Sequence, residues 1–79
     1  MNDAILPAQS RAGRALLNWS RDELAAKGGV PARTVADFEL GNTAPQRRTL
    51  SAIRAALEQA GVVFTNGDEP GVKLRKPDQ

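Results

Sequence analysis

The middle of the chain contains two short helical segments that are separated by a pair of glycines. Ser20 is a favourable N-cap for the first segment, and Glu23 three residues later completes a capping box. Gly28 and Gly29 end this segment, because glycine adopts the left-handed conformation without a steric penalty. Pro31 can open the second segment, since proline is tolerated in the first turn of a helix. The sequence therefore predicts two short helices joined by a sharp turn.

A glycine-containing turn of three to four residues between two short helices is typical of the helix-turn-helix motif. The first helix of this motif crosses the DNA backbone and braces the second. The second helix presents its N-terminal residues to base edges in the major groove, which is wide enough to admit it. The apolar residues expected to fix the angle between the two helices are Leu24, Ala25, Val30, Val35 and Phe38. The motif therefore favours binding to double-stranded DNA.

Helices are also predicted on both sides of this motif. Pro7 can begin a helix that runs to Leu17, and a longer one is predicted from about Gln46 to Ala60, where Gly61 ends it. In the first, Ala8, Ala12, Ala15 and Leu16 recur at helical spacing, and the second has an apolar stripe of Leu50, Ile53, Leu57 and Ala60. We therefore expect a mainly α, compact domain of four to five helices over residues 1–61.

The last eighteen residues, 62–79, have the pattern of a small β-hairpin. Residues 62–65 are β-prone, residues 66–71 are rich in turn formers, and residues 72–75 alternate apolar and basic side chains, as a half-buried strand does. Because a two-stranded hairpin is marginally stable alone, it must lie on the helices or pair with another subunit. We expect this extension to contribute to a dimer contact, for which the candidate residues are Val62, Phe64, Val72 and Leu74.

The composition argues against several classes of protein. The 79 residues include no cysteine and no histidine, which removes disulfides, Cys or His nucleophiles and nearly all zinc or transition-metal sites. Helix capping explains the adjacent acidic pair Asp22 and Glu23, and a turn explains Asp68 and Glu69. We therefore expect a protein that is not an enzyme, with no catalytic residues, no metal and no cofactor.

Neither a membrane segment nor a secretion signal is expected. The apolar runs are far shorter than the roughly 20 residues of a membrane helix. The first residues lack the basic start and the long apolar stretch of a signal peptide. These features predict a cytoplasmic protein that has no membrane partner.

Size and charge both favour a homodimer. A single core in a chain this short supplies only a few kcal/mol of stability, and neither disulfides nor metals are available to add to it. The net charge of +2 is low for indiscriminate coating of nucleic acid, which needs a dense basic face. Such a charge suits a protein that doubles its DNA contacts by dimerising.

Many residues in and after the motif match one family at fixed spacings. They are residues 20–27 (Ser20 to Lys27), Gly29, Val30, Thr34, Val35, Phe38, Glu39, Gly41, Asn42, Pro45, Thr49, Leu50, Ile53, Ala56 and Leu57. This set resembles the XRE family, the Cro/C1-type (lambda repressor-like) regulators, over about residues 8–61. The tail resembles the ending of some short single-domain bacterial members. The resemblance implies a helical domain that binds operator DNA, usually as a homodimer on an inverted repeat.

The resemblance also implies which residues contact DNA. In the recognition helix, about residues 31–40, the base-reading positions carry Ala32, Arg33 and Asp37 with Thr34 beside them, and Arg21 matches a position that contacts phosphate or supports base reading. The fork of Arg33 fits the O6 and N7 acceptors of guanine. Asp37 accepts from a cytosine amino group, orients Arg33, or is merely a salt-bridge partner. The positions that grip the phosphate backbone carry Ser20, Asn42, Thr43, Arg47 and Arg48.

The chain departs from the family at three positions. Gly28 stands where an apolar residue or alanine is usual, and Pro31 replaces the common Ser or Thr cap of the recognition helix. Ala32 is too short to hydrogen-bond a base and can only pack against a thymine methyl group. Sequence specificity is therefore expected to be modest or to depend on DNA shape.

Three functional hypotheses follow. The first is a sequence-specific transcriptional regulator, a homodimeric repressor that binds an inverted-repeat operator. The second is an antitoxin-type or other partner-binding protein, in which the tail docks a toxin or co-regulator and DNA binding is secondary. The third is a structural helical module that binds no DNA.

In the first helix we expect Arg11 and Arg14 to be solvated charges, and we expect Trp19 to lie in the core.

Overall fold

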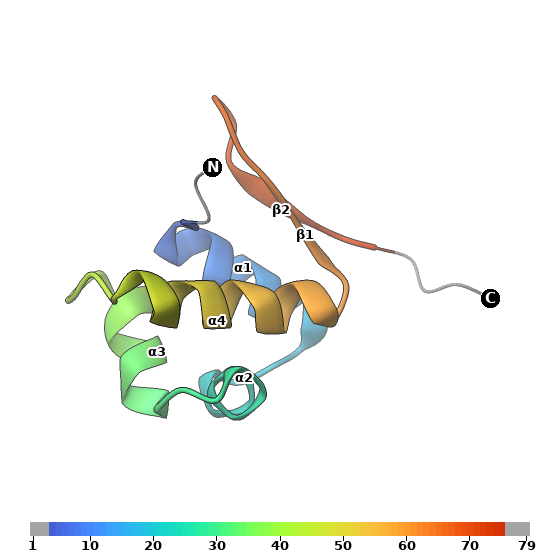
Figure 1. Ribbon diagram of the computed structural model, residues 1–79. Coiled ribbons are helices and arrows are strands. Elements are labelled where there is room, and N and C mark those ends of the chain that lie inside the picture. Colours follow the sequence, from blue (N-terminus) through green and yellow to red (C-terminus); the bar gives the residue numbers. More distant parts are fainter. Residues whose placement is uncertain (1–3, 76–79) are drawn as a thin grey trace.

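The computed structural model describes residues 4–75, which form four helices and a two-stranded antiparallel sheet (Figure 1). The elements are α1 (Pro7–Leu17), α2 (Arg21–Gly28), α3 (Ala32–Glu39), α4 (Arg47–Gln59), β1 (Val62–Thr65) and β2 (Gly71–Leu74). Figure 1 shows the hairpin on the side of α1 and α4 that faces away from α2 and α3. This arrangement confirms the mainly α fold with a small C-terminal hairpin. No helix within the described residues is long and apolar enough to cross a membrane.

The helix α1 buries its polar side and not the apolar residues whose spacing predicted the helix. Its buried residues are Gln9, Ser10 and Gly13, whereas Ala8, Ala15 and Leu16 are exposed. Burial of Gln9 and Ser10 is possible because both side chains form hydrogen bonds to other elements. At Gly13 a Cβ atom would lie 3.4 Å from a Leu57 methyl group, which is an ordinary contact distance, so α1 packs against α4 at this position.

The helix α2 begins with the predicted capping box and ends at the predicted glycine turn. The Ser20 hydroxyl accepts a hydrogen bond from the backbone N–H of Glu23 at 3.0 Å, and the Glu23 carboxylate accepts from the N–H of Ser20 at 2.9 Å. The helix α2 ends at Gly28, and Gly29 has a φ of 68°, in the left-handed region. Pro31 is the N-cap of α3 and makes no side-chain cap hydrogen bond. The predicted sharp turn is therefore confirmed.

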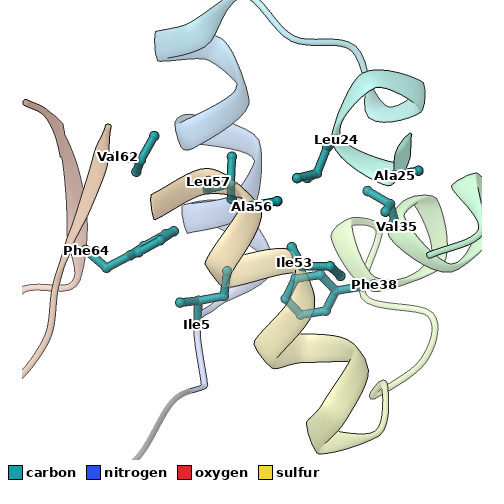
Figure 2. Packing of buried hydrophobic residues seen from close by; sticks show 10 residues of the cluster. All are labelled: Ile5, Leu24, Ala25, Val35, Phe38, Ile53, Ala56, Leu57, Val62 and Phe64. Carbon is teal, nitrogen blue, oxygen red and sulfur yellow. The ribbon is translucent and has the colours of Figure 1, made fainter. Parts of the chain in front are cut away.

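The core lies between α4 and the other elements (Figure 2). It consists of Ile5, Leu24, Ala25, Val35, Phe38, Ile53, Ala56, Leu57, Val62 and Phe64. Ile5, which precedes α1, was not expected in it. Trp19 is half-buried and packs against this cluster instead of lying inside it.

The hairpin belongs to the same core as the helices. Val62 is 1% exposed and Phe64 is 8% exposed, and Figure 2 shows both side chains directed from β1 toward the helices. Their packing corrects the expectation that these two side chains are free for a dimer contact. Of the other two candidates, Val72 is half-buried against the core and Leu74 remains 45% exposed.

Candidate nucleic-acid interface

The N-terminal half of α3 presents one long basic side chain to solvent. The side chain of Arg33 is 92% exposed, and its Nε lies 3.8 Å from the Oδ2 of Asp37, one turn later. At 3.8 Å this ion pair is not a hydrogen bond, so the guanidinium keeps its donors available for base acceptors. Ala32 is exposed and Thr34 is half-buried beside them. The structure therefore brings together the four predicted base-reading positions of α3 on the first turns of one short helix.

The start of α2 carries Arg21 and Ser20, both of them exposed. The Ser20 hydroxyl oxygen accepts the capping hydrogen bond, which leaves its own proton free to donate. Asp22 and Glu23 lie in the same first turn and place negative charge at this helix end. These carboxylates make the start of α2 less attractive to phosphate than a helix end without acidic residues.

The loop after α3 and the start of α4 form a second exposed polar surface. Asn42, Thr43, Arg47 and Arg48 are all exposed. The N-cap of α4 is Gln46, whose side chain caps no backbone N–H, and the first turn of α4 contains no acidic residue. Because a helix N-terminus carries a partial positive charge, the two arginines make this end strongly positive. Such an end favours binding of phosphate.

The C-terminal end of α3 is held by a buried polar network that the sequence did not predict. The Glu39 carboxylate is buried and accepts hydrogen bonds from Ser10 Oγ at 2.6 Å and from Arg14 Nη2 at 2.7 Å and Nε at 2.9 Å. The side chain of Arg14 is only 18% exposed, so the expectation of a solvated charge at this position is wrong. Arg11 is exposed, and its Nη1 donates to the backbone oxygen of Glu39.

This network connects α1 to the end of α3. Arg14 also donates from Nη1 to the backbone oxygen of Trp19 at 3.0 Å, so one guanidinium joins α1, the entry to α2 and the end of α3. A buried carboxylate needs such partners, because an uncompensated buried charge is strongly unfavourable. The network therefore fixes the position of α3 relative to the other helices. Ser10 and Arg14 are four residues apart and therefore share one face of α1, but this spacing does not identify Glu39 as their partner.

A family model for the helix-turn-helix domain of the Cro/C1 type matches residues 11–59 of the chain. The chain belongs to the XRE family of Cro/C1-type helix-turn-helix proteins. The matched region contains α2, α3 and α4 in full, together with most of α1. A search of curated proteins finds no match.

Membership of the XRE family settles the general class of the site. The family consists of DNA-binding regulatory domains and not of enzymes, so the chain is a DNA-binding regulator of this type. Within residues 4–75 no three acidic side chains gather as a metal site would require. The contacts of individual residues with bases or phosphates remain predictions, as do those with a second copy.

The three departures from the XRE pattern have visible structural counterparts. Gly28 lies against α4, and a Cβ atom there would be 3.4 Å from the backbone oxygen of Ala52 and 3.7 Å from Ala56 Cβ. These are ordinary contact distances, so the structure leaves room for the alanine that is usual in the family. Pro31 leaves α3 without a side-chain cap, and Ala32 is exposed with only a methyl group to offer. Among the base-reading positions, Arg33 therefore has the longest reach.

Proposed function

We propose that this protein is a homodimeric repressor that binds an inverted-repeat operator through α3 in the major groove. The observation that carries the proposal is the exposure of Arg33. Its side chain is 92% exposed near the start of α3, a helix that the buried network of Glu39 holds against α1. Its fork suits the O6 and N7 atoms of guanine, a contact that contributes about 1–3 kcal/mol of discrimination. Asp37 orients this fork or accepts from a neighbouring cytosine.

The phosphate backbone is gripped on both sides of α3. Arg47 and Arg48 lie at the positive start of α4, next to the exposed loop residues Asn42 and Thr43. On the other side, Ser20 and Arg21 lie at the start of α2. Phosphate contacts of this kind set the register of a protein on the duplex, while the base contacts supply the specificity.

A dimer of this domain represses by occupying a promoter. If both recognition helices enter the same face of the duplex, the half-sites are separated by about 34–36 Å, one helical turn. Because one arginine makes most of the base contacts in each half-site, a single monomer discriminates only weakly between DNA sequences. The inverted repeat therefore matters more to affinity here than it does for a protein with several long base-reading side chains.

The experiment that tests this proposal is a selection of bound fragments from the source genome at near-physiological salt. We expect enrichment of an inverted repeat with a guanine in each half-site, including a site upstream of the protein's own gene. Absence of any enriched sequence, with a folded and dimeric protein, would contradict the repressor proposal. That result would instead favour the hypothesis of a partner-binding protein for which DNA binding is secondary.

A further inference from the structure

A small hollow of about 220 Å³ lies between α2, α4 and the connection that joins α1 to α2. It is lined by Trp19, Lys27, Ala56, Gln59 and Ala60. Figure 1 shows this connection beside the C-terminal end of α4, where Gln59 and Ala60 lie. None of the five residues is among the predicted DNA contacts, so a ligand in the hollow would not compete with DNA for a contacting side chain.

Three side chains around the hollow can donate hydrogen bonds. Trp19 has an indole N–H, Lys27 an ammonium group and Gln59 an amide NH₂ group. Within residues 4–75 none of these side chains forms a hydrogen bond or an ion pair. Lys27 and Gln59 are exposed and Trp19 is half-buried. Unpartnered donors from three segments of the chain favour a ligand with acceptor oxygens and negative charge, as in a carboxylate.

The rest of the lining favours a flat apolar group. Ala56 and Ala60 contribute only methyl groups, and the indole ring of Trp19 contributes an aromatic surface. A second aromatic ring packs well against indole in an offset or edge-to-face arrangement. Because sites for drug-sized ligands enclose about 300–1,000 Å³, this smaller hollow suits a molecule with a single ring.

Two helix ends near the hollow make the charge of Lys27 decisive. The helix α2 ends at Gly28, one residue after Lys27, and α4 ends at Gln59. The C-terminal end of a helix carries a partial negative charge, which opposes an anion but fades beyond the last turn. No acidic side chain lines the hollow, and the exposed ammonium group of Lys27 carries a full positive charge. Binding of an anion therefore depends on Lys27.

We propose that this hollow binds a small aromatic carboxylate. The ring of the ligand packs against Trp19, and its carboxylate accepts hydrogen bonds from Lys27 and from the amide of Gln59. Such a ligand contacts both α2 and α4, so it adds to the packing of the first helix of the motif against α4. The inference goes beyond the proposed function and does not depend on it, because the site contains no predicted DNA contact.

Titration of the nitrogen-15-labelled full chain with benzoate, followed by NMR, tests the proposal without DNA. Trp19 is the only tryptophan, so a single indole N–H peak reports on the hollow. We expect benzoate to shift this peak along a saturating curve with a dissociation constant of about 1 mM, as a ligand of this size allows. Acetate lacks the ring and benzylammonium carries the opposite charge, so each should bind at least about tenfold more weakly.

Two variants and a matched control locate the site. Lys27→Met removes the charge, keeps an unbranched apolar stem and should weaken benzoate binding at least about tenfold. Ala60→Leu fills part of the hollow from its wall and should abolish the benzoate shift. Lys73→Met makes the same change at an exposed lysine of β2 outside the hollow and should leave the dissociation constant unchanged.

Several results would overturn the proposal. One is a benzoate titration that does not saturate, and another is acetate or benzylammonium binding as tightly as benzoate. The third is an equal effect of Lys27→Met and Lys73→Met, which would show that the carboxylate is not held at Lys27. The fourth is unchanged benzoate binding in Ala60→Leu, which would place the ligand outside the hollow.

Discussion

Replacing Glu39 by glutamine tests whether the buried network holds the recognition helix in place. Glu39 is 2% exposed, and its carboxylate accepts hydrogen bonds from Ser10 and from two nitrogens of Arg14, so every donor around it points at a negative charge. Glutamine keeps the shape but removes the charge, and its amide group places N–H donors against those of Arg14. The guanidinium then stays largely buried without a counter-ion.

Removing one partner of a buried ion pair costs about 3–5 kcal/mol. A chain of 79 residues has a total stability of about 4–12 kcal/mol at 0.05–0.15 kcal/mol per residue. The Glu39→Gln variant should therefore lose a large part of its free energy of unfolding and show a much lower urea midpoint. The control is Asp37→Asn, which breaks an ion pair of the i,i+4 type whose arginine side chain is 92% exposed. That change should cost about 0.5 kcal/mol.

A double variant separates the charge from the packing. Arg14→Met combined with Glu39→Leu replaces the ion pair by apolar side chains, and such a replacement is often neutral in stability. We expect this double variant to be more stable than Glu39→Gln alone in urea unfolding followed by circular dichroism. A Glu39→Gln variant no less stable than Asp37→Asn would refute the reasoning.

Four other substitutions distinguish base reading, phosphate contact and the stability of the fold. Arg33→Ala should lower the ratio of operator to random-DNA affinity by about 5- to 150-fold for each half-site in gel-shift titrations, and equal losses on both DNAs would contradict a base-reading role. Arg47→Ala should weaken binding to all sequences and flatten the salt dependence of log K by about one unit for each bound subunit; an unchanged slope would argue against phosphate contact. Gly28→Ala should stabilise the fold by about 0.5–1 kcal/mol in thermal melts, because the methyl group fits against α4. Gly29→Ala should instead lower the melting temperature, since φ is 68° there, and shifts of the same sign in both variants would show that this distinction is wrong.

Local features of the chain were predictable because each depends on a few neighbouring residues. The capping box at Ser20 and Glu23 and the left-handed Gly29 follow from backbone chemistry. The apolar spacing of the fourth helix predicted α4 to within one residue at each end. The alternation of Val72 to Arg75 predicted the second strand in the same way.

The misses concern contacts between distant segments. Nothing near Arg14 indicates that its partner is Glu39, which is 25 residues away in the sequence. Val62 and Phe64 have the same pattern whether a strand packs on its own helices or on a second chain, and only the docked hairpin distinguishes the two. Ile5 lies alone in a stretch without periodicity, so no pattern marked it as part of the core.

The hydrogen bonds of Gln9 with the hairpin have a consequence for the order of folding. They join residues separated by 56 and 62 positions, to Thr65 and to Gly71, whereas α2 and α3 are adjacent in the sequence. Closing a long loop costs more chain entropy than closing a short one. We expect the α2–α3 pair to form from local contacts and the hairpin to dock onto α1 afterwards. Amide exchange at the hairpin should then report how tightly the two ends of the domain are joined.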